Sequence, residues 1–356
     1  MAVGNVSDGS MNSSRVVRQP GYPKTTARFN LAMALLSVWF IIGLFVDGAA
    51  HNHGAVDDSF FTPWHAILYA SVAATGAALI YTQYQHVNRG FAWGKALPRG
   101  YFLSLVGVIM FLLGGILDLG WHEVFGLEPN IEALISPPHL LLAVSAFLFV
   151  SGPLRSAWQG AQAINDWQSL LPVLISILVL FSLLTFFTMY SNPVSQPDEF
   201  RTRMNSTLSV AAVTGILLLS ILMMGCILPL VHRWSLPFGS LAAILGFNAL
   251  LMFGLRLGFI RPYWFMVVGF FFVGLAADGL LQRWGPLRNR LRIFRFFAFA
   301  LPVVYFLVYF VMVWKFGGLT WSIHMWLGVT FMTGVAGVLL SFLVQPPPAF
   351  ADEVDG

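Results

Sequence analysis

The chain has 356 residues, of which 58% are hydrophobic and only 10% carry a charge. Soluble domains carry roughly 25% charged residues, so this composition excludes an ordinary water-soluble protein. The formal net charge of +4 comes mostly from loops between apolar segments and gives no support to nucleic-acid binding. The sequence therefore predicts a protein that lies in a lipid bilayer.

About ten apolar segments follow one another, each near the roughly 20 residues that a helix needs to cross a bilayer. The alternating pattern of a transmembrane barrel strand is absent. A spanning segment must also satisfy its own backbone hydrogen bonds. We therefore expect an all-α, polytopic integral membrane protein of about ten transmembrane helices. The expected helices cover residues 30–47, 62–83, 100–120, 138–156, 168–192, 205–230, 236–255, 260–282, 293–316 and 320–344.

Basic residues indicate which loops face the cytoplasm. They gather before the first segment, after the second and after the eighth, at Arg15, Arg18, Lys24, Arg28, Arg89, Lys95, Arg99, Arg288, Arg290, Arg292 and Arg295. With ten helices these regions share one side, which we assign to the cytoplasm together with both termini. This assignment leaves four arginines outside, namely Arg201, Arg203, Arg256 and Arg261. We expect the cytoplasmic membrane of a bacterium or archaeon, with the first helix as an uncleaved anchor.

The chain divides into four expected regions. Residues 1–29 and 345–356 are cytoplasmic tails, residues 30–156 hold the first four helices, and residues 157–344 form a six-helix hydrophobic region. Because Cys226 is the only cysteine, an intramolecular disulfide, a zinc ribbon and an iron–sulfur cluster are excluded. Any bound metal must therefore be held by nitrogen and oxygen donors, with methionine as a softer option.

One motif, Asp-x-x-x-His followed after a loop by Ser/Thr-Pro-x-His, occurs twice in the first four segments. The two copies comprise Asp47, His51, Thr62, Pro63 and His65, and then Asp118, His122, Ser136, Pro137 and His139. We interpret the two copies as a tandem repeat of a helical hairpin. Aspartate and histidine are common metal ligands, so the repeat predicts a site in a chain that is otherwise nearly all hydrocarbon.

The first copy shows how such a hairpin would be built. Asp47 and His51 are four residues apart, so they share one face while the helix continues. Thr62 is a favourable N-cap and a proline suits the first helical position, which places His65 in the first turn of the next helix. There the helix dipole disfavours imidazolium and leaves the neutral imidazole that ligates metals. Each hairpin thus presents one carboxylate and two imidazoles at one membrane level.

Two imidazoles and a carboxylate suit a first-row transition metal, for which we favour copper, with zinc and iron as alternatives. Parallel repeats tend to be related by an axis along the membrane normal. Such an axis would bring both sets of side chains towards a common centre at the outer face. One shared ion, two adjacent ions and two separate sites all stay open. A proton-transfer site and a purely structural pairing of the hairpins are further alternatives.

Other polar residues near the expected outer face are candidates for accessory roles. As groups that support the ligands we expect His53, Asp57, Asp58, Glu123, Glu128 and Glu132. His324 is either a fifth imidazole, a quinone-contacting residue or an ordinary interfacial histidine. Catalytic residues cannot be assigned from the sequence.

The first copy of the motif also resembles a known metal-binding pattern. Asp47-x3-His51 followed by a distant His65 is similar to the pattern in the C-type subunit of copper membrane monooxygenases, the methane and ammonia oxidisers. The resemblance covers roughly twenty residues and implies copper binding by this triplet and, by repetition, by Asp118, His122 and His139. The spacing to the last histidine is one residue longer here, and four longer in the second copy. The duplication and the helix number also depart from that subunit.

We therefore expect an integral membrane metalloprotein, and favour a copper- or iron-dependent oxidoreductase acting on a small or lipophilic substrate. A metal transport or delivery protein is one alternative, although the first four helices carry few polar groups across the membrane. A zinc-dependent hydrolase with Glu123 or Glu132 as the base is another. A haem ligated by His65 and His139 ranks behind these. The lipid bilayer is the expected partner, while partner subunits and a homo-oligomer stay open.

Overall fold

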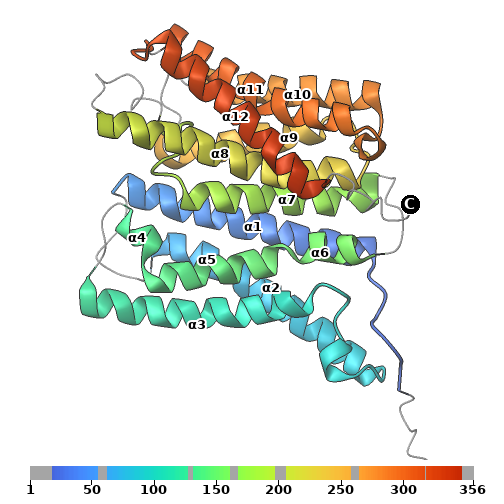
Figure 1. Cartoon of the computed structure of the whole chain (residues 1–356). Coiled ribbons are helices and arrows are strands. Elements are labelled where there is room, and N and C mark those ends of the chain that lie inside the picture. The colour runs from blue at the N-terminus through green and yellow to red at the C-terminus, as the bar shows by residue number, and fades with distance from the viewer. Residues whose placement is uncertain are drawn as a thin grey trace, which may run out of the picture.

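The computed structural model describes residues 18–54, 62–126, 131–160, 167–196, 206–257, 264–316 and 318–346. These residues form a bundle of helices (Figure 1), and among them the only β-type pairing is an isolated bridge between Gln19 and Phe91. The α-helices are α1 (Ala27–Asn52), α2 (Pro63–Asn88), α3 (Phe102–Phe125), α4 (Glu132–Ile135), α5 (Pro137–Val150), α6 (Gly152–Gln159), α7 (Trp167–Phe187), α8 (Ser206–Arg233), α9 (Ser240–Leu257), α10 (Phe265–Trp284), α11 (Leu291–Phe316) and α12 (Ile323–Val344).

The all-α class is confirmed, and the lengths of the helices support an integral membrane protein. Eight of the described helices are long and apolar enough to cross a bilayer, namely α1, α2, α3, α7, α8, α10, α11 and α12. The two other expected segments differ from a single long helix. Residues 138–156 form the bent pair of α5 and α6, and residues 236–255 become α9, whose apolar part covers only Ser240–Leu255.

The bend between α5 and α6 has a local cause. The two helices meet at Ser151 at an angle of 44°, and Pro153 is the second residue of α6. A proline has no backbone N–H and its ring clashes with the carbonyl four residues earlier, which favours a kink or a break in the helix. The Phe149 carbonyl, which thereby loses its helical donor, accepts a hydrogen bond from the Ser104 hydroxyl at 3.2 Å. The segment expected as one straight helix is therefore broken.

Helix α1 occupies a central place in the bundle. It packs against α2 and α5 on one side and against α7 and α9 on the other. Figure 1 shows it between the group of α2, α3 and α5 and the group of α7–α12. Small residues let α1 approach both neighbours closely, because a Cβ at Gly43 would lie 3.0 Å from the Leu68 backbone of α2 and one at Gly48 would lie 2.6 Å from the Phe186 ring of α7. The aspartate-bearing α1 is thereby fixed from both sides.

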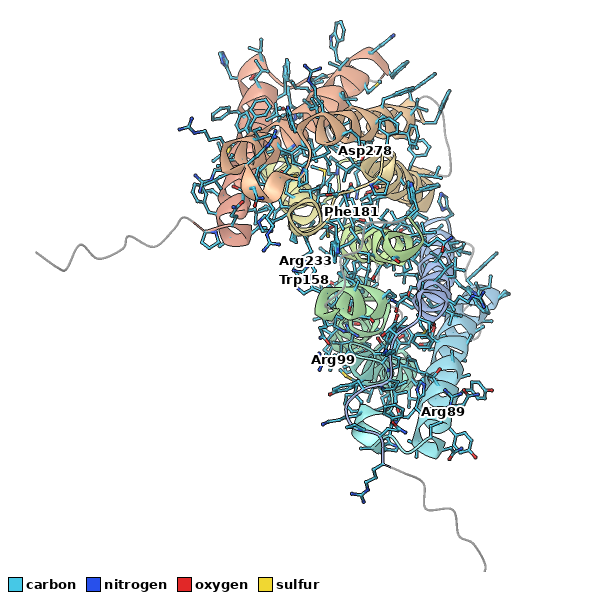
Figure 2. All side chains as sticks on the ribbon, turned by 90° about the vertical axis from the view of Figure 1, so that its right-hand side faces the viewer. Arg89, Arg99, Trp158, Phe181, Arg233 and Asp278 are labelled. Carbon is cyan, nitrogen blue, oxygen red and sulfur yellow. The ribbon has the colours of Figure 1, made fainter. Side chains whose placement is uncertain are left out.

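The bundle has two chemically different ends. Successive membrane-length elements alternate in direction, so α1 and α3 end where α2, α5 and α12 begin, on the left in Figure 1. Figure 2 views the opposite end, where Arg89, Arg99 and Arg233 lie. The other described basic residues at that end are Arg18, Lys24, Arg28, Lys95, Arg155, Arg283, Arg288, Arg290, Arg292 and Arg295. At the left end Arg256 lies in the last turn of α9 and Lys315 in the last turn of α11, while Arg15, Arg201, Arg203 and Arg261 lie outside the described residues.

Candidate metal centre

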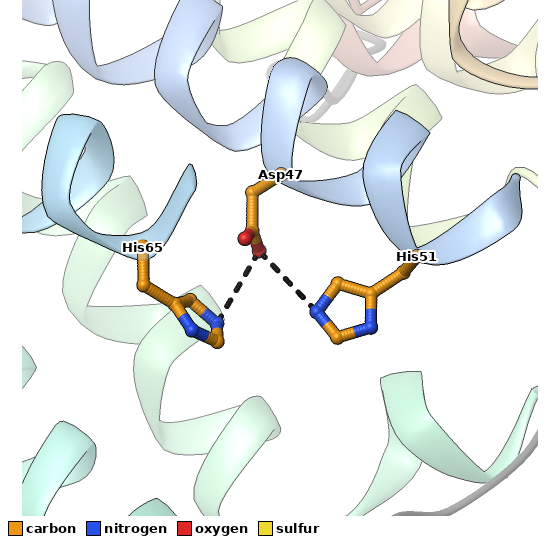
Figure 3. A group of neighbouring side chains, drawn as sticks. All are labelled: Asp47, His51 and His65. Atoms are coloured by element: carbon orange, nitrogen blue, oxygen red, sulfur yellow. Dashed lines mark ion pairs between the residues drawn. The ribbon is translucent and has the colours of Figure 1, made fainter. Parts of the chain in front are cut away.

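The first motif folds into a compact triad at the junction of α1 and α2 (Figure 3). Asp47 and His51 lie one turn apart near the end of α1, and His65 is the third residue of α2. The Oδ2 atom of Asp47 lies 3.9 Å from Nε2 of His51 and 3.5 Å from Nε2 of His65. The two imidazole rings are 5.8 Å apart between centroids. The carboxylate therefore faces two imidazole nitrogens from two different helices.

The second motif forms an equivalent triad where α3 ends and α5 begins. The Oδ1 atom of Asp118 lies 3.5 Å from Nε2 of His122 and 3.4 Å from Nδ1 of His139. The ring centroids of the two histidines are 5.9 Å apart. In both triads one donor atom from each residue lies within 4.8 Å of the others. The structure thus brings together the six residues that the repeat predicts, in two groups of the same composition.

The start of each second helix positions its histidine, but in two different ways. Thr62 is the N-cap of α2, and its hydroxyl accepts a hydrogen bond from the backbone N–H of His65 at 3.1 Å. Ser136 is the N-cap of α5, yet its hydroxyl lies 2.8 Å from Nδ1 of the His139 ring. A proline follows each cap at the first helical position, as expected. The capping residue orients the backbone in the first hairpin and the imidazole itself in the second.

The aspartates are buried without enough hydrogen-bond donors. Their side chains are only 11% exposed for Asp47 and 5% exposed for Asp118. One carboxylate oxygen of each, Oδ1 in both cases, is fully buried and accepts no hydrogen bond. For Asp118 this is the oxygen that both imidazole nitrogens approach, at 3.4–3.5 Å. A buried carboxylate oxygen without a hydrogen-bond donor is costly, and a cation between the three donors would compensate it.

The donor spacing fits a transition-metal ion. Nitrogen and oxygen ligands lie about 2.0–2.2 Å from such an ion, so two ligands are separated by at most about 4.4 Å. The donor atoms of each triad lie within 4.8 Å of one another, so small side-chain rotations would bring all three to bonding distance. Aspartate and histidine are suitable donors for copper, iron and zinc. Both triads therefore pass the geometric requirement for holding an ion.

The two triads are neighbours and do not merge. The six donor atoms separate into two sets rather than one cluster. The two sets nevertheless interact electrostatically. Asp47 of the first set interacts with Asp118 and His139 of the second. His51 of the first set interacts with Asp118 and His122 of the second. Of the arrangements left open by the sequence, the grouping of the donor atoms matches two sites and not one shared ion.

The accessory residues that the structure describes are not among the donor atoms of either triad. His53, Glu123, Glu132 and His324 are exposed and belong to neither group. The His53 ring is occupied locally, since its Nδ1 lies 2.7 Å from the Ala49 carbonyl. The accessory candidates Asp57, Asp58 and Glu128 lie outside the described residues.

One residue beside the triads, Tyr69, is not part of the repeated motif and was not predicted from the sequence. Tyr69 lies one turn after His65 on α2, with 6.4 Å between the two ring centroids, and it is half-buried. Its hydroxyl reaches α3 at Gly115, one turn before Asp118. The four-residue spacing between His65 and Tyr69 marks the shared helix face, but the contact with α3 depends on how the two helices pack.

Comparison with other proteins adds no relative. No protein-family model matches the chain, and neither a curated protein nor a solved structure matches it. The similarity of the first motif to the copper monooxygenase subunit therefore stays a prediction, and the function has to be inferred from the site.

Proposed function

We propose that this protein is a membrane metalloenzyme that holds two adjacent transition-metal ions, copper or iron, and oxidises or reduces a small or lipophilic substrate. The observation that carries the proposal is the pair of triads, each with a buried carboxylate that faces two imidazole nitrogens. Asp47, His51 and His65 would hold one ion, and the second triad would hold the other. Intramembrane ionisable groups of this kind are functional by default.

The number of donors supports catalysis over a purely structural metal. Structural sites close the coordination sphere with four protein ligands, whereas catalytic sites keep a position for water or substrate. Each triad supplies three donors, and two histidines with one carboxylate match the donor set of non-haem iron oxygenases. Bound copper or iron would supply reversible electron transfer at this point. The protein's own residues would hold the ions in place and keep the surroundings apolar.

The surface next to the triads suits small or apolar substrates. The His51 side chain is 43% exposed at the end of α1, so the first triad is accessible from the aqueous end of the bundle. Beside the second triad, Ile116 and Leu117 on α3 are exposed apolar side chains that a bilayer would cover. A substrate dissolved in lipid can therefore reach the same end of the bundle as one dissolved in water.

The charge distribution supports placing the site on the extracytoplasmic face. The described arginines and lysines lie mostly at the end opposite the triads, and positively charged ends face the cytoplasm. Figure 2 shows three of them, of which Arg233 stacks 5.6 Å above the Trp158 ring, a pairing typical of a membrane interface. The triads would then meet substrates from outside the cell.

The test is elemental analysis of detergent-purified protein. Wild-type protein is expected to carry about two equivalents of copper or iron, and the His65→Ala/His139→Ala double variant is expected to lose both. The matched control is His53→Ala/His324→Ala, which removes two exposed histidines at the same end of the bundle and should keep the metal. Folded wild-type protein that stays metal-free after incubation with copper, iron and zinc salts would overturn the proposal.

The identity of the ion separates oxidative chemistry from hydrolysis. Copper or iron should change oxidation state reversibly when the purified protein is treated with ascorbate and then ferricyanide, as seen by electron paramagnetic resonance. Zinc at full occupancy, with activity only in the zinc form, would instead support a hydrolase with a metal-activated water.

A further inference from the structure

We propose that Tyr69 is a positioning residue shared by the two metal sites, so that filling one site changes the affinity of the other. This inference rests on the proposed function. It adds a residue outside the repeated motif and a property, coupling between sites, that two independent triads would lack.

The ring of Tyr69 belongs to the first site. It lies on α2 four residues after His65, edge-on to that imidazole with centroids 6.4 Å apart. On its other side it meets Phe111 of α3 at 5.7 Å. A ring held between His65 and a buried phenylalanine has little freedom to rotate, so it limits the orientations that the His65 imidazole can adopt.

The hydroxyl of Tyr69 reaches the second hairpin. A Cβ added to Gly115 would lie 2.4 Å from this oxygen, so only a glycine lets the hydroxyl sit this close to α3. Gly115 lies three residues before Asp118, less than one turn of the helix away. A side chain that begins beside His65 therefore ends against α3, three residues before the aspartate of the other triad.

Electrostatics place the hydroxyl under the influence of both sites. Both carboxylates interact with it, that of Asp118 more strongly than that of Asp47. An ion bound at Asp118 would neutralise much of the charge that acts on this hydroxyl, and the tyrosine would transmit the change to His65. Groups that support metal ligands in this way alter metal affinity about 10–100-fold. By linkage, the effect of the first site on the second equals the reverse effect.

The experiment measures copper affinity at each site, with Cu²⁺ as the probe and a competing chelator. The His51→Ala variant leaves only the second site intact, and the His122→Ala variant leaves only the first. The affinity of the intact site in each variant is compared with its affinity in the wild type, where the other site can also fill. The same comparison is then made in proteins that also carry Tyr69→Phe. In the tyrosine background, we expect occupancy of one site to change the affinity of the other at least about fivefold. In the phenylalanine background, both sites should still fill, with affinities that no longer depend on each other.

Two further variants separate coupling from packing. Gly115→Ala keeps the hydroxyl but displaces it, and should also reduce the coupling. Tyr84→Phe removes an exposed hydroxyl from the same helix and should change nothing. Electron paramagnetic resonance of the two bound Cu²⁺ ions checks separately that each variant fills the sites it is expected to fill.

The outcomes are distinct from those that test the proposed function. If wild-type protein binds no metal, both proposals fail together. If it binds two equivalents but Tyr69→Phe leaves the affinities and their interdependence unchanged, the metal sites stand and the role of Tyr69 is refuted. A loss of thermal stability in Tyr69→Phe without any change in coupling would also refute it, because it would show a packing role alone.

Discussion

The Nε2 atom of His65 lies 3.5 Å from the Oδ2 atom of Asp47, although the two residues belong to different helices. The pair in the second hairpin, His139 and Asp118, is 3.4 Å apart. In each case a histidine in the first turn of one helix meets an aspartate near the end of the preceding one. The contact therefore depends on the junction between the two helices, and a change there should affect metal binding more than stability.

Replacing Asp118 with asparagine should separate metal binding from folding. We expect Asp118→Asn to lose one of the two metal equivalents, because a neutral amide replaces the anionic donor. In the presence of a chelator its thermal stability should equal or exceed that of the wild type, because the buried oxygen accepts no hydrogen bond. Elemental analysis and thermal unfolding check both parts. A metal-free variant that is clearly less stable than metal-free wild type would indicate a structural partner for this carboxylate.

The close contact between α9 and α10 should be intolerant of a methyl group at one position. Gly274→Ala would place its Cβ 2.3 Å from the Ala242 backbone, and overpacking of this kind costs about 1–3 kcal/mol. Gly279→Ala on the same helix meets no atom within 4 Å and serves as the control. Thermal unfolding in detergent should fall for the first variant only. Equal stability of the two would contradict the observed packing.

A buried aspartate far from the triads stabilises the start of α9. The carboxylate of Asp278 on α10 accepts hydrogen bonds from the backbone N–H groups of Gly239, Leu241 and Ala242 at 3.0–3.1 Å. Asp278→Ala should destabilise the fold by at least about 2 kcal/mol, since it leaves several buried donors unsatisfied.

The matched variant Asp278→Asn keeps one acceptor oxygen and should lose less stability than the alanine. Metal content should stay unchanged in both variants, because α9 and α10 contribute no residue to either triad. Chemical unfolding followed by tryptophan fluorescence ranks the three proteins. A loss of metal in the folded asparagine variant would show that the two halves of the bundle are linked.

Cysteine labelling in whole cells should reveal the orientation. His53 is exposed at the triad end, and Ala92 is exposed at the basic end. A membrane-impermeant thiol reagent should therefore modify His53→Cys in intact cells and Ala92→Cys only after the cells are opened. The native Cys226 lies within the apolar α8, so unmodified wild-type protein provides the background. Reversed labelling would place the triads in the cytoplasm.

Much of the site could be predicted because its geometry is local. The four-residue spacing of Asp47 and His51 implies one helix face, and the structure keeps both residues within α1. The threonine cap and the following proline correctly predict His65 in the first turn of α2. These rules involve only neighbours in the chain, so no knowledge of the packing is needed.

The remaining features depend on contacts between helices. Tyr69 is one of many aromatic residues in an apolar helix, and its importance appears only where α2 meets α3 at Gly115. The hydrogen bond between the Ser136 hydroxyl and the His139 ring depends on side-chain rotamers. The sequence around Ser136 is equally compatible with an ordinary N-cap, in which the hydroxyl would bond the backbone. The break at Ser151 could not be read from hydropathy, because the strongly apolar α5 dominates residues 138–156, although Pro153 marks the position.

Each triad is contained within a single hairpin, in residues 47–65 and residues 118–139. Membrane proteins emerge from the ribosome in order, with their N-terminal parts first. The donor atoms of the first triad can therefore meet while most of the chain is still untranslated, and those of the second can meet before α7 is made. Maturation of these sites does not have to wait for the C-terminal half, and the hairpin is short enough to be transplanted as a unit into another helical scaffold.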